Sequence, residues 1–153
     1  MNEKTERFLR VLDRERHNRP LLRAAVNYLK NPDDAGTLAR LAPSNLLDDP
    51  VGLLCLGLYE LAPIDSRNAE NLGASLKKLQ SSRTSETLER RLRRILESER
   101  EELRNILPAL FQFLGSSKVA VDYAQLHEDL TYWSSEITFR KKAWLEAFYR
   151  EAE

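Results

Sequence analysis

Apolar residues recur along most of this chain at intervals of three and four, the spacing that places them on one side of an α-helix. The pattern is interrupted at prolines, at Gly115 and at short runs of serine, asparagine and aspartate, which end helices or cap their first turns. Strand-like runs of β-branched and aromatic residues are missing. The expected fold class is therefore all-α, with about eight helices at residues 5–16, 21–31, up to 42, 51–62, 71–80, 88–115, 122–133 and 134–149.

The strongest interruption of this pattern is the segment 81–85, whose sequence is SSRTS. We expect a single domain over residues 1–153, divided at this seam into two small packed bundles, one N-terminal and one C-terminal. The helix at 51–62 is apolar on all sides, which is typical of the buried centre of a bundle. Asp49 and Pro50 give it an N-cap and a proline first turn, and Gly52 and Gly57 are expected to let neighbouring helices approach closely.

Composition narrows the class of protein further. The 24 basic and 24 acidic residues give a formal net charge of zero, which argues against a polycation that coats nucleic acid but leaves room for a local basic face. The single cysteine, Cys55, cannot form an internal disulfide and lies in an apolar run, which suits a reducing cytoplasm. The longest apolar stretch, residues 51–59, is too short to span a bilayer, so no membrane contact is expected.

Residues that could carry catalysis or hold a cofactor are few and scattered. His17 and His127 have no partner at metal-binding spacing, and His127 flanks an apolar helix face, which favours a structural or surface role. Glycine-rich phosphate loops, nucleophile elbows and zinc motifs are absent from the sequence. We therefore expect neither an enzyme nor a metal or cofactor site, although an enzyme with a dispersed site stays open.

Arginine is placed unevenly on the helix predicted at 88–115. At about 100° per residue, its leucines and isoleucines share one side. Four arginines share one flank of that apolar stripe: Arg90, Arg93, Arg100 and Arg104. One interpretation is a solvated face with pairs such as Glu86–Arg90. The other is a row of guanidinium groups positioned for phosphates.

Two further charged features need a partner outside their own helix. Glu99 projects near the centre of the apolar stripe, so we expect it to be buried and paired with a basic residue of another helix, with Arg23 as the candidate. Arg140, Lys141 and Lys142 open the last predicted helix, where cations oppose the helix dipole. Local stability does not explain this cluster, which favours a binding role.

Three stretches beyond residue 71 share motifs with a known family. Residues 71–79, NLGASLKKL, look like its LGxSLxxL helix. ERRL at 89–92 and EREEL at 99–103 resemble its E-R-R/x-F … A-D-R-D-E-L helix. VDYAQL at 121–126, followed by Trp133, Trp144 and the pair FY at 148–149, resembles its VDYxxLxxDLxxW … RxWxxxFY ending. The chain thus resembles the CasB family, the small subunit of the type I-E CRISPR Cascade surveillance complex, with the N-terminal half matching more loosely.

The resemblance implies a role in cytoplasmic antiviral defence. Such subunits are all-α, form two bundles and lie as a pair of copies along Cascade, in contact with its backbone-forming and large subunits. Their basic face follows the displaced strand of the target DNA and approaches the crRNA–target heteroduplex, where it stabilises the R-loop without cutting DNA. By position, the resemblance marks six basic residues: Arg23, Lys78, Arg90, Arg91, Arg100 and Lys142.

We therefore expect a non-catalytic Cascade subunit that binds RNA and DNA through a basic helical face. The candidate nucleic-acid-binding residues are Arg23, Lys78, Arg90, Arg91, Arg93, Arg100, Arg104, Arg140, Lys141 and Lys142. The alternative is a helical adaptor between proteins that makes no contact with nucleic acid. The two hypotheses differ in whether these cations converge on one continuous positive face.

Overall fold

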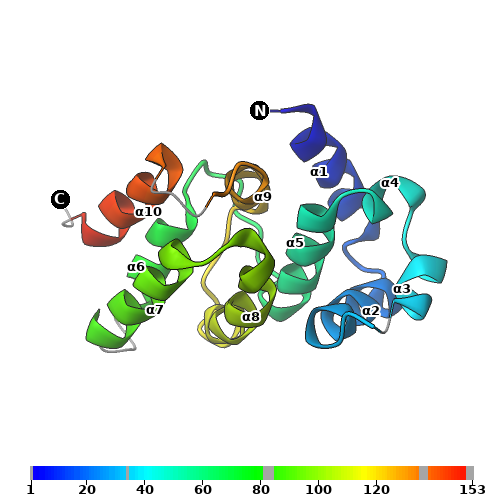
Figure 1. Ribbon diagram of the computed structural model, residues 1–153, viewed down its shortest axis with the longest axis horizontal. Helices are drawn as coiled ribbons and strands as arrows, with labels where there is room; N and C mark the ends of the chain where they lie inside the picture. Colours follow the sequence, from blue (N-terminus) through cyan, green and yellow to red (C-terminus); the bar gives the residue numbers. More distant parts are fainter. Residues whose placement is uncertain (1, 34, 81–84, 135–137, 151–153) are drawn as a thin grey trace.

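The computed structural model describes every residue except 1, 34, 81–84, 135–137 and 151–153, and the side chain of Ser85. Within these residues the chain is all-α, as predicted, and its only β-bridge is the isolated one between Asp65 and Val121 (Figure 1). The ten helices of the described part are α1 (Glu3–Glu15), α2 (Arg19–Lys30), α3 (Gly36–Leu41), α4 (Ser44–Leu47), α5 (Pro50–Leu61), α6 (Leu72–Leu79), α7 (Ser85–Glu97), α8 (Arg100–Ser116), α9 (Tyr123–Thr131) and α10 (Phe139–Tyr149). Residues 81–84 of the predicted seam lie outside the described residues, and Ser85 begins α7.

Helix starts follow the capping signals in the sequence. The Asp49 side chain accepts a hydrogen bond from the Gly52 N–H at 2.9 Å, and Pro50 occupies the first turn of α5. Asp122 caps α9 in the same way, with the Gln125 N–H as donor at 3.0 Å. These two predicted caps are therefore confirmed.

Helix α5 is the centre of the fold, as its apolar sequence predicts. Every residue from Val51 to Tyr59 is buried, and α2, α4, α8 and α9 pack around this helix (Figure 1). At Gly57 a Cβ atom would lie 3.2 Å from the carbonyl oxygen of Ala25 and closer still to Leu29, so glycine lets α2 approach closely. Cys55 is fully buried, and burial holds the pKa of its thiol well above the usual range. Its expected role as a core residue is confirmed.

Helices α6 and α10 form the second close contact, although they are far apart in sequence. Gly73 of α6 faces the backbone of Trp144 in α10, where an added Cβ would overlap the Trp144 carbonyl. The Asn71 side chain also donates to the Ala143 carbonyl at 3.1 Å. Trp144 is fully buried and packs on Trp133, with ring centroids 5.0 Å apart. Helix α10 is therefore fixed to α6 by backbone-level contact as well as by apolar burial.

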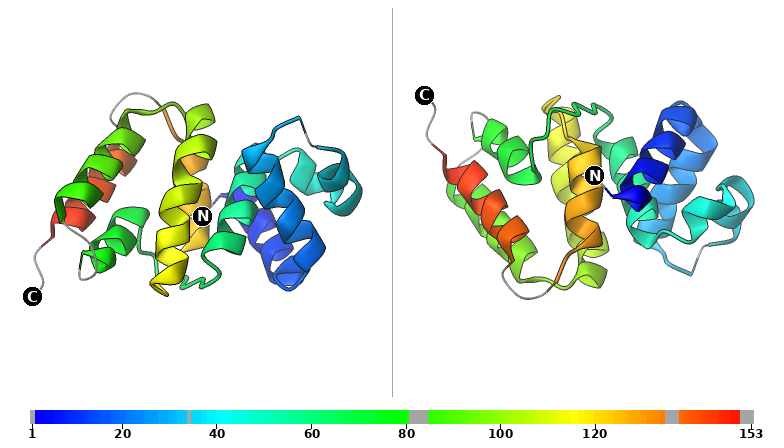
Figure 2. Two further views of the ribbon diagram at one scale, coloured as in Figure 1. Left: turned by 90° about the horizontal axis from the view of Figure 1, so that it is seen from below. Right: turned by 90° about the horizontal axis from the view of Figure 1, so that it is seen from above.

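The prediction of a single long helix at 88–115 is wrong. The chain turns at Ser98 and Glu99 and begins a second helix, α8 (Figure 2, left view). Glu99 has extended backbone, with φ −70° and ψ 155°. The carbonyls at and just beyond the end of α7 find side-chain donors from later in the chain. Trp133 Nε1 donates to the Ser98 carbonyl at 3.0 Å, and Lys141 Nζ donates to the Leu96 carbonyl at 2.8 Å.

The expectation for Glu99 is also wrong. Glu99 is exposed at the start of α8, and its predicted pairing with Arg23 does not form. The reason is the turn between α7 and α8, which removes Glu99 from the apolar stripe that one continuous helix would have given it. No buried carboxylate is left at this position to be compensated.

His127 is a buried structural residue, as expected from its place beside an apolar face. Its Nδ1 lies 2.8 Å from Thr5 Oγ1 of α1, and its Nε2 lies 2.8 Å from Asp49 Oδ2 at the start of α5. The imidazole stacks on Phe8 with ring centroids 4.7 Å apart. One side chain of α9 thereby joins the N-terminal helix to the central one.

Among the described helices, none has the length and hydropathy needed to cross a membrane.

Candidate nucleic-acid interface

The outer side of α7 carries three arginines close together. Arg90 and Arg94 are exposed and lie one turn apart, and Arg91 is half-buried beside them. The only ion pair of Arg90 among the described residues is with Glu86 at 4.0 Å, and because both side chains are exposed it contributes little to stability.

A hollow of about 180 Å³ lies between α7 and α8, beside Arg91 and Arg94. We call it the α7–α8 hollow, and its lining residues are Arg91, Arg94, Ile95, Asn105, Ile106, Ala109 and Leu110. Two guanidinium groups and one amide therefore line an apolar floor, and no carboxylate is among the lining residues.

The two arginines of the α7–α8 hollow keep donors available. The Arg91 guanidinium lies over the Phe113 ring, 4.7 Å from its centroid, and its N–H groups form no hydrogen bond with the described residues. The Arg94 side chain forms no hydrogen bond or ion pair with the described residues, and Asn105 is exposed. Planar forks with permanent charge are suited to phosphate oxygens, and the amide supplies both a donor and an acceptor.

The row of arginines predicted on one helix is divided by the turn at Ser98 and Glu99. Arg93 faces α10 and pairs with Glu89 at 2.9 Å. The pKa of Arg93 is raised, first by its hydrogen bond with the Tyr149 hydroxyl and then by the charge of Glu89. Arg100 and Arg104 lie on α8 and line a separate groove with α2 and α5. The structure thus brings Arg90 and Arg91 together with Arg94, and separates them from Arg100 and Arg104.

Tertiary contacts explain two of the three cations at the start of α10, Arg140 and Lys141. Arg140 donates to Asp129 at 2.8 Å, and its guanidinium lies over the rings of Tyr132 and Phe139, 4.9 and 5.1 Å from their centroids. Burial raises the pKa of Asp129, and the hydrogen bonds from Trp144, Arg140 and Gln125 offset only part of that effect.

Lys141 is in the core rather than on the surface, with 1% of its area exposed. Its ammonium caps the C-terminal end of α7 and lies 4.7 Å from the centroid of the Trp133 ring. Burial lowers its pKa, and the charge of Glu99 acts in the opposite direction. Lys141 therefore has a structural role here, and we leave it out of the interface.

The remaining predicted cations are exposed but dispersed. Lys142 lies on α10 and Arg23 on α2, and neither side chain is hydrogen-bonded or ion-paired with the described residues. Lys78 of α6 pairs with Glu70 at 2.9 Å. These three residues belong to different helices from the α7–α8 hollow, so they do not extend it.

Sequence reasoning missed Arg94 and Asn105. Arg94 follows Arg91 by three positions, and this spacing places the two guanidinium groups on neighbouring turns. That signal was available. Asn105 could not have been found, because its position beside α7 depends on the turn between the helices.

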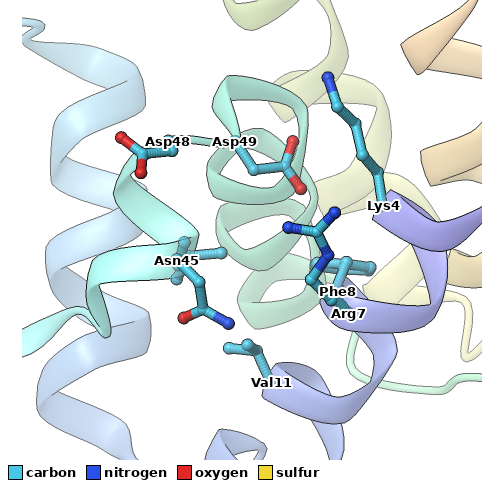
Figure 3. A pocket seen from close by; sticks show the side chains of 8 residues that line it. Lys4, Arg7, Phe8, Val11, Asn45, Asp48 and Asp49 are labelled. Atoms are coloured by element: carbon cyan, nitrogen blue, oxygen red, sulfur yellow. The ribbon is translucent and has the colours of Figure 1, made fainter.

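A second small cavity, of about 60 Å³, lies between α1, α4 and the two aspartates that precede α5. Figure 3 shows the Asp49 carboxylate beside it, with Lys4 and Arg7 projecting from α1 and Asp48 nearby. Both signs of charge are therefore present at this cavity, unlike at the α7–α8 hollow. In the described part of the chain, no three histidine, cysteine or acidic residues are grouped so as to hold a metal ion.

The same fold is found in several solved structures. A chain of a CRISPR RNA-guided surveillance complex superposes with a TM-score of 0.72 at 20% identity, covering 96% of this chain and 91% of that chain. CasB from M. ruber gives 0.70 at 23% identity, with 96% and 93% covered. CasB from Thermus thermophilus gives 0.70 at 22% identity, with 97% and 99% covered.

No curated protein matches the sequence. The family model for CRISPR-associated protein Cse2, however, matches residues 9–149 and thus nearly the whole chain, including α7, α8 and the hollow between them. The chain belongs to the CRISPR-associated Cse2 family.

Proposed function

We propose that this protein is a non-catalytic small subunit of a type I-E CRISPR Cascade complex in the cytoplasm. In this role it joins the backbone-forming and large subunits, together with a second copy of itself, and stabilises the R-loop. The Cse2 family match over residues 9–149 supports this proposal, as does the likeness to a chain of a surveillance complex. The observation that carries the nucleic-acid contact is the α7–α8 hollow, which Arg91 and Arg94 line without a carboxylate among the other lining residues.

The hollow suits the sugar-phosphate backbone of a single strand. Arg91 and Arg94 can each present two parallel N–H groups to a phosphate, while Arg90 extends the positive surface along α7. The apolar floor and the Asn105 amide fit the sugar or the edge of an unpaired base. We assign this surface to the displaced DNA strand and to the neighbouring crRNA–target region. Because the net charge of the chain is zero, these contacts bind nucleic acid only where neighbouring subunits extend the positive surface around the α7–α8 hollow.

The alternative function, an adaptor between proteins that does not touch nucleic acid, is favoured by a different observation. Arg93, Arg140 and Lys141 are all engaged with groups of the protein itself. If every arginine were held in this way, the charged surface would be purely structural. The available donors of Arg91 and Arg94 are what favour the first function.

The test is a Cascade complex reconstituted with the double variant Arg91→Ala and Arg94→Ala. Target-DNA affinity is expected to fall about tenfold, since two phosphate contacts are lost. The slope of log affinity against log salt should become shallower by about 1.4, at about 0.7 for each single-strand phosphate contact. Both quantities can be measured by fluorescence anisotropy with labelled target DNA over a range of salt concentrations.

The matched control removes the same charge elsewhere, with Arg10→Ala and Arg14→Ala on the exposed side of α1. It should leave both affinity and slope unchanged. Gel filtration and a thermal melt verify that both doubly substituted chains enter the complex and stay folded. Equal affinities for the α7 variant and the unsubstituted protein would establish the adaptor function instead.

A further inference from the structure

A groove of about 300 Å³ lies on another side of the molecule, between α2 and the first turns of α5 and α8. We call it the α2–α5–α8 groove, and its lining residues are Tyr28, Leu29, Pro50, Val51, Leu54, Arg100, Glu101 and Arg104. Its floor is aliphatic, whereas the charged side chains all come from the first two turns of α8. The rim therefore carries two guanidinium groups against one carboxylate.

The two guanidinium groups are fixed in place. Arg100 Nη1 donates to the Thr131 carbonyl at 3.2 Å, and Arg104 Nη2 donates to the Tyr28 carbonyl at 2.7 Å. The Arg104 guanidinium also lies over the Tyr28 ring, 5.0 Å from its centroid. Because Arg100 and Arg104 are one turn apart on α8, both side chains line the same groove. A rigid, partly desolvated pair of this kind loses little side-chain entropy on binding.

The chemistry of this groove differs from that of the α7–α8 hollow. The one aromatic ring on which a base could stack, Tyr28, is covered by Arg104. Glu101 offsets one of the two guanidinium charges, so the rim keeps a single net positive charge, which matches one carboxylate rather than a run of phosphates. The floor of Leu29, Val51 and Leu54 matches an apolar side chain, and arginine and tyrosine are the residue types that dominate protein–protein binding energy.

We propose that the α2–α5–α8 groove docks a segment of a neighbouring protein subunit. The segment carries an aliphatic or aromatic side chain, which fills the floor, next to a carboxylate, which pairs with Arg100 and Arg104. This inference rests on the proposed function, because the partner is another protein of the assembled complex. It assigns the α8 arginines to assembly and the α7 arginines to nucleic acid.

The test measures uptake of the chain into Cascade that lacks only this subunit and carries guide RNA but no target DNA. With Arg100→Glu, the subunit concentration for half-maximal uptake is expected to rise at least about tenfold, because like charges then face each other. With Glu101→Arg it should stay the same or fall. A thermal melt of the isolated chain shows whether either variant is misfolded. Unchanged uptake of a folded Arg100→Glu chain would overturn the inference.

A photo-crosslinking amino acid in place of the exposed Glu101 identifies the occupant without depending on a destabilising change. The expected product is a protein–protein adduct that survives nuclease treatment, with none formed from the same crosslinker at Arg10 on α1. An adduct that nuclease removes, or no adduct from a chain that has entered the complex, would contradict the proposal. If the Arg100→Glu chain entered the complex normally while the α7 variant bound DNA more weakly, this inference would be rejected and the proposed function would stand. Failure of the unsubstituted chain to enter the complex would reject the proposed function as well.

Discussion

Replacing Gly73 with alanine is expected to lower the free energy of unfolding by about 3 kcal/mol, the upper part of the range for overpacked sites. The new methyl group would overlap the Trp144 carbonyl, and a backbone group cannot rotate away as a side chain can. Helices α6 and α10 would have to separate, exposing part of the contact around Trp144. For a chain of this length, the loss corresponds to a melting temperature lower by roughly 10 °C, which calorimetry can measure.

The matched control for this substitution is Gly36→Ala at the start of α3, where an added Cβ meets nothing within 4 Å. Alanine there should leave stability unchanged or raise it by up to about 1 kcal/mol, because it restricts the unfolded chain. If Gly73→Ala melted like Gly36→Ala, the close contact between α6 and α10 would not exist in solution.

The second large effect is expected at Asp49, where one carboxylate serves two helices. Its Oδ1 caps α5, and its Oδ2 accepts from buried His127, which is linked in turn to Thr5 of α1. Asp49→Ala removes the cap and leaves an imidazole nitrogen without its partner. The expected loss is about 2 to 4 kcal/mol, the sum of a typical cap and an unsatisfied buried group. Urea unfolding at neutral pH measures it.

The same site predicts a dependence on pH. Burial alone would raise the pKa of Asp49, but the hydrogen bond and charge of His127 and the Gly52 N–H outweigh it and hold the pKa below its usual value. A carboxyl group whose pKa is lower in the folded state than in the unfolded state stabilises the fold at pH values above the unfolded-state pKa, which is about 3.9 for aspartate. This stabilisation is lost as the pH falls through the folded-state pKa. The stability difference between the unsubstituted protein and Asp49→Asn should therefore be full at neutral pH and shrink below about pH 4. A difference that stayed constant down to that pH would show that the Asp49 charge is not stabilised by its neighbours.

Much of the fold could be predicted because its signals are local. Asp49 and Asp122 stand directly before the helices that they cap, and a capping side chain needs only the backbone of the next turn. The apolar sequence of α5 likewise predicts burial without reference to any partner. These features were predicted correctly from residues that lie within a few positions of each other.

The turn between α7 and α8 could not be predicted in this way. Ser98 and Glu99 carry neither a proline nor a glycine, and the surrounding residues all favour a helix. The helix ends there because Trp133 and Lys141 supply donors to its last carbonyls from 35 and 45 residues further along the chain. Every expectation that depended on a continuous helix, including the burial of Glu99 and the single row of arginines, was wrong for this reason.

The candidate site shows the same division between local and distant information. Arg90 was identified both from the helix pattern and from the family resemblance, whereas Arg91 was identified from the resemblance alone. Arg91 lines the α7–α8 hollow, and Arg90 precedes it on α7. Lys141 was also predicted to bind nucleic acid, as one of three cations at the start of a predicted helix, yet it is buried and bonded to the end of α7. The sequence alone does not distinguish a cation that is exposed at the start of a helix from one that is buried there and donates to the end of another helix.

The contact between α6 and α10 sets an order of events during synthesis. Asn71, which caps α6, bonds to a carbonyl 72 residues later, so α6 leaves the ribosome long before its partner exists. During that interval Gly73 faces water, and the last carbonyls of α7 lack the Lys141 ammonium. The C-terminal helices therefore assemble late, through contacts of large sequence separation, which slow folding. Slowing translation between α6 and α10 would lengthen the time for which this half of the molecule is exposed to chaperones and proteases.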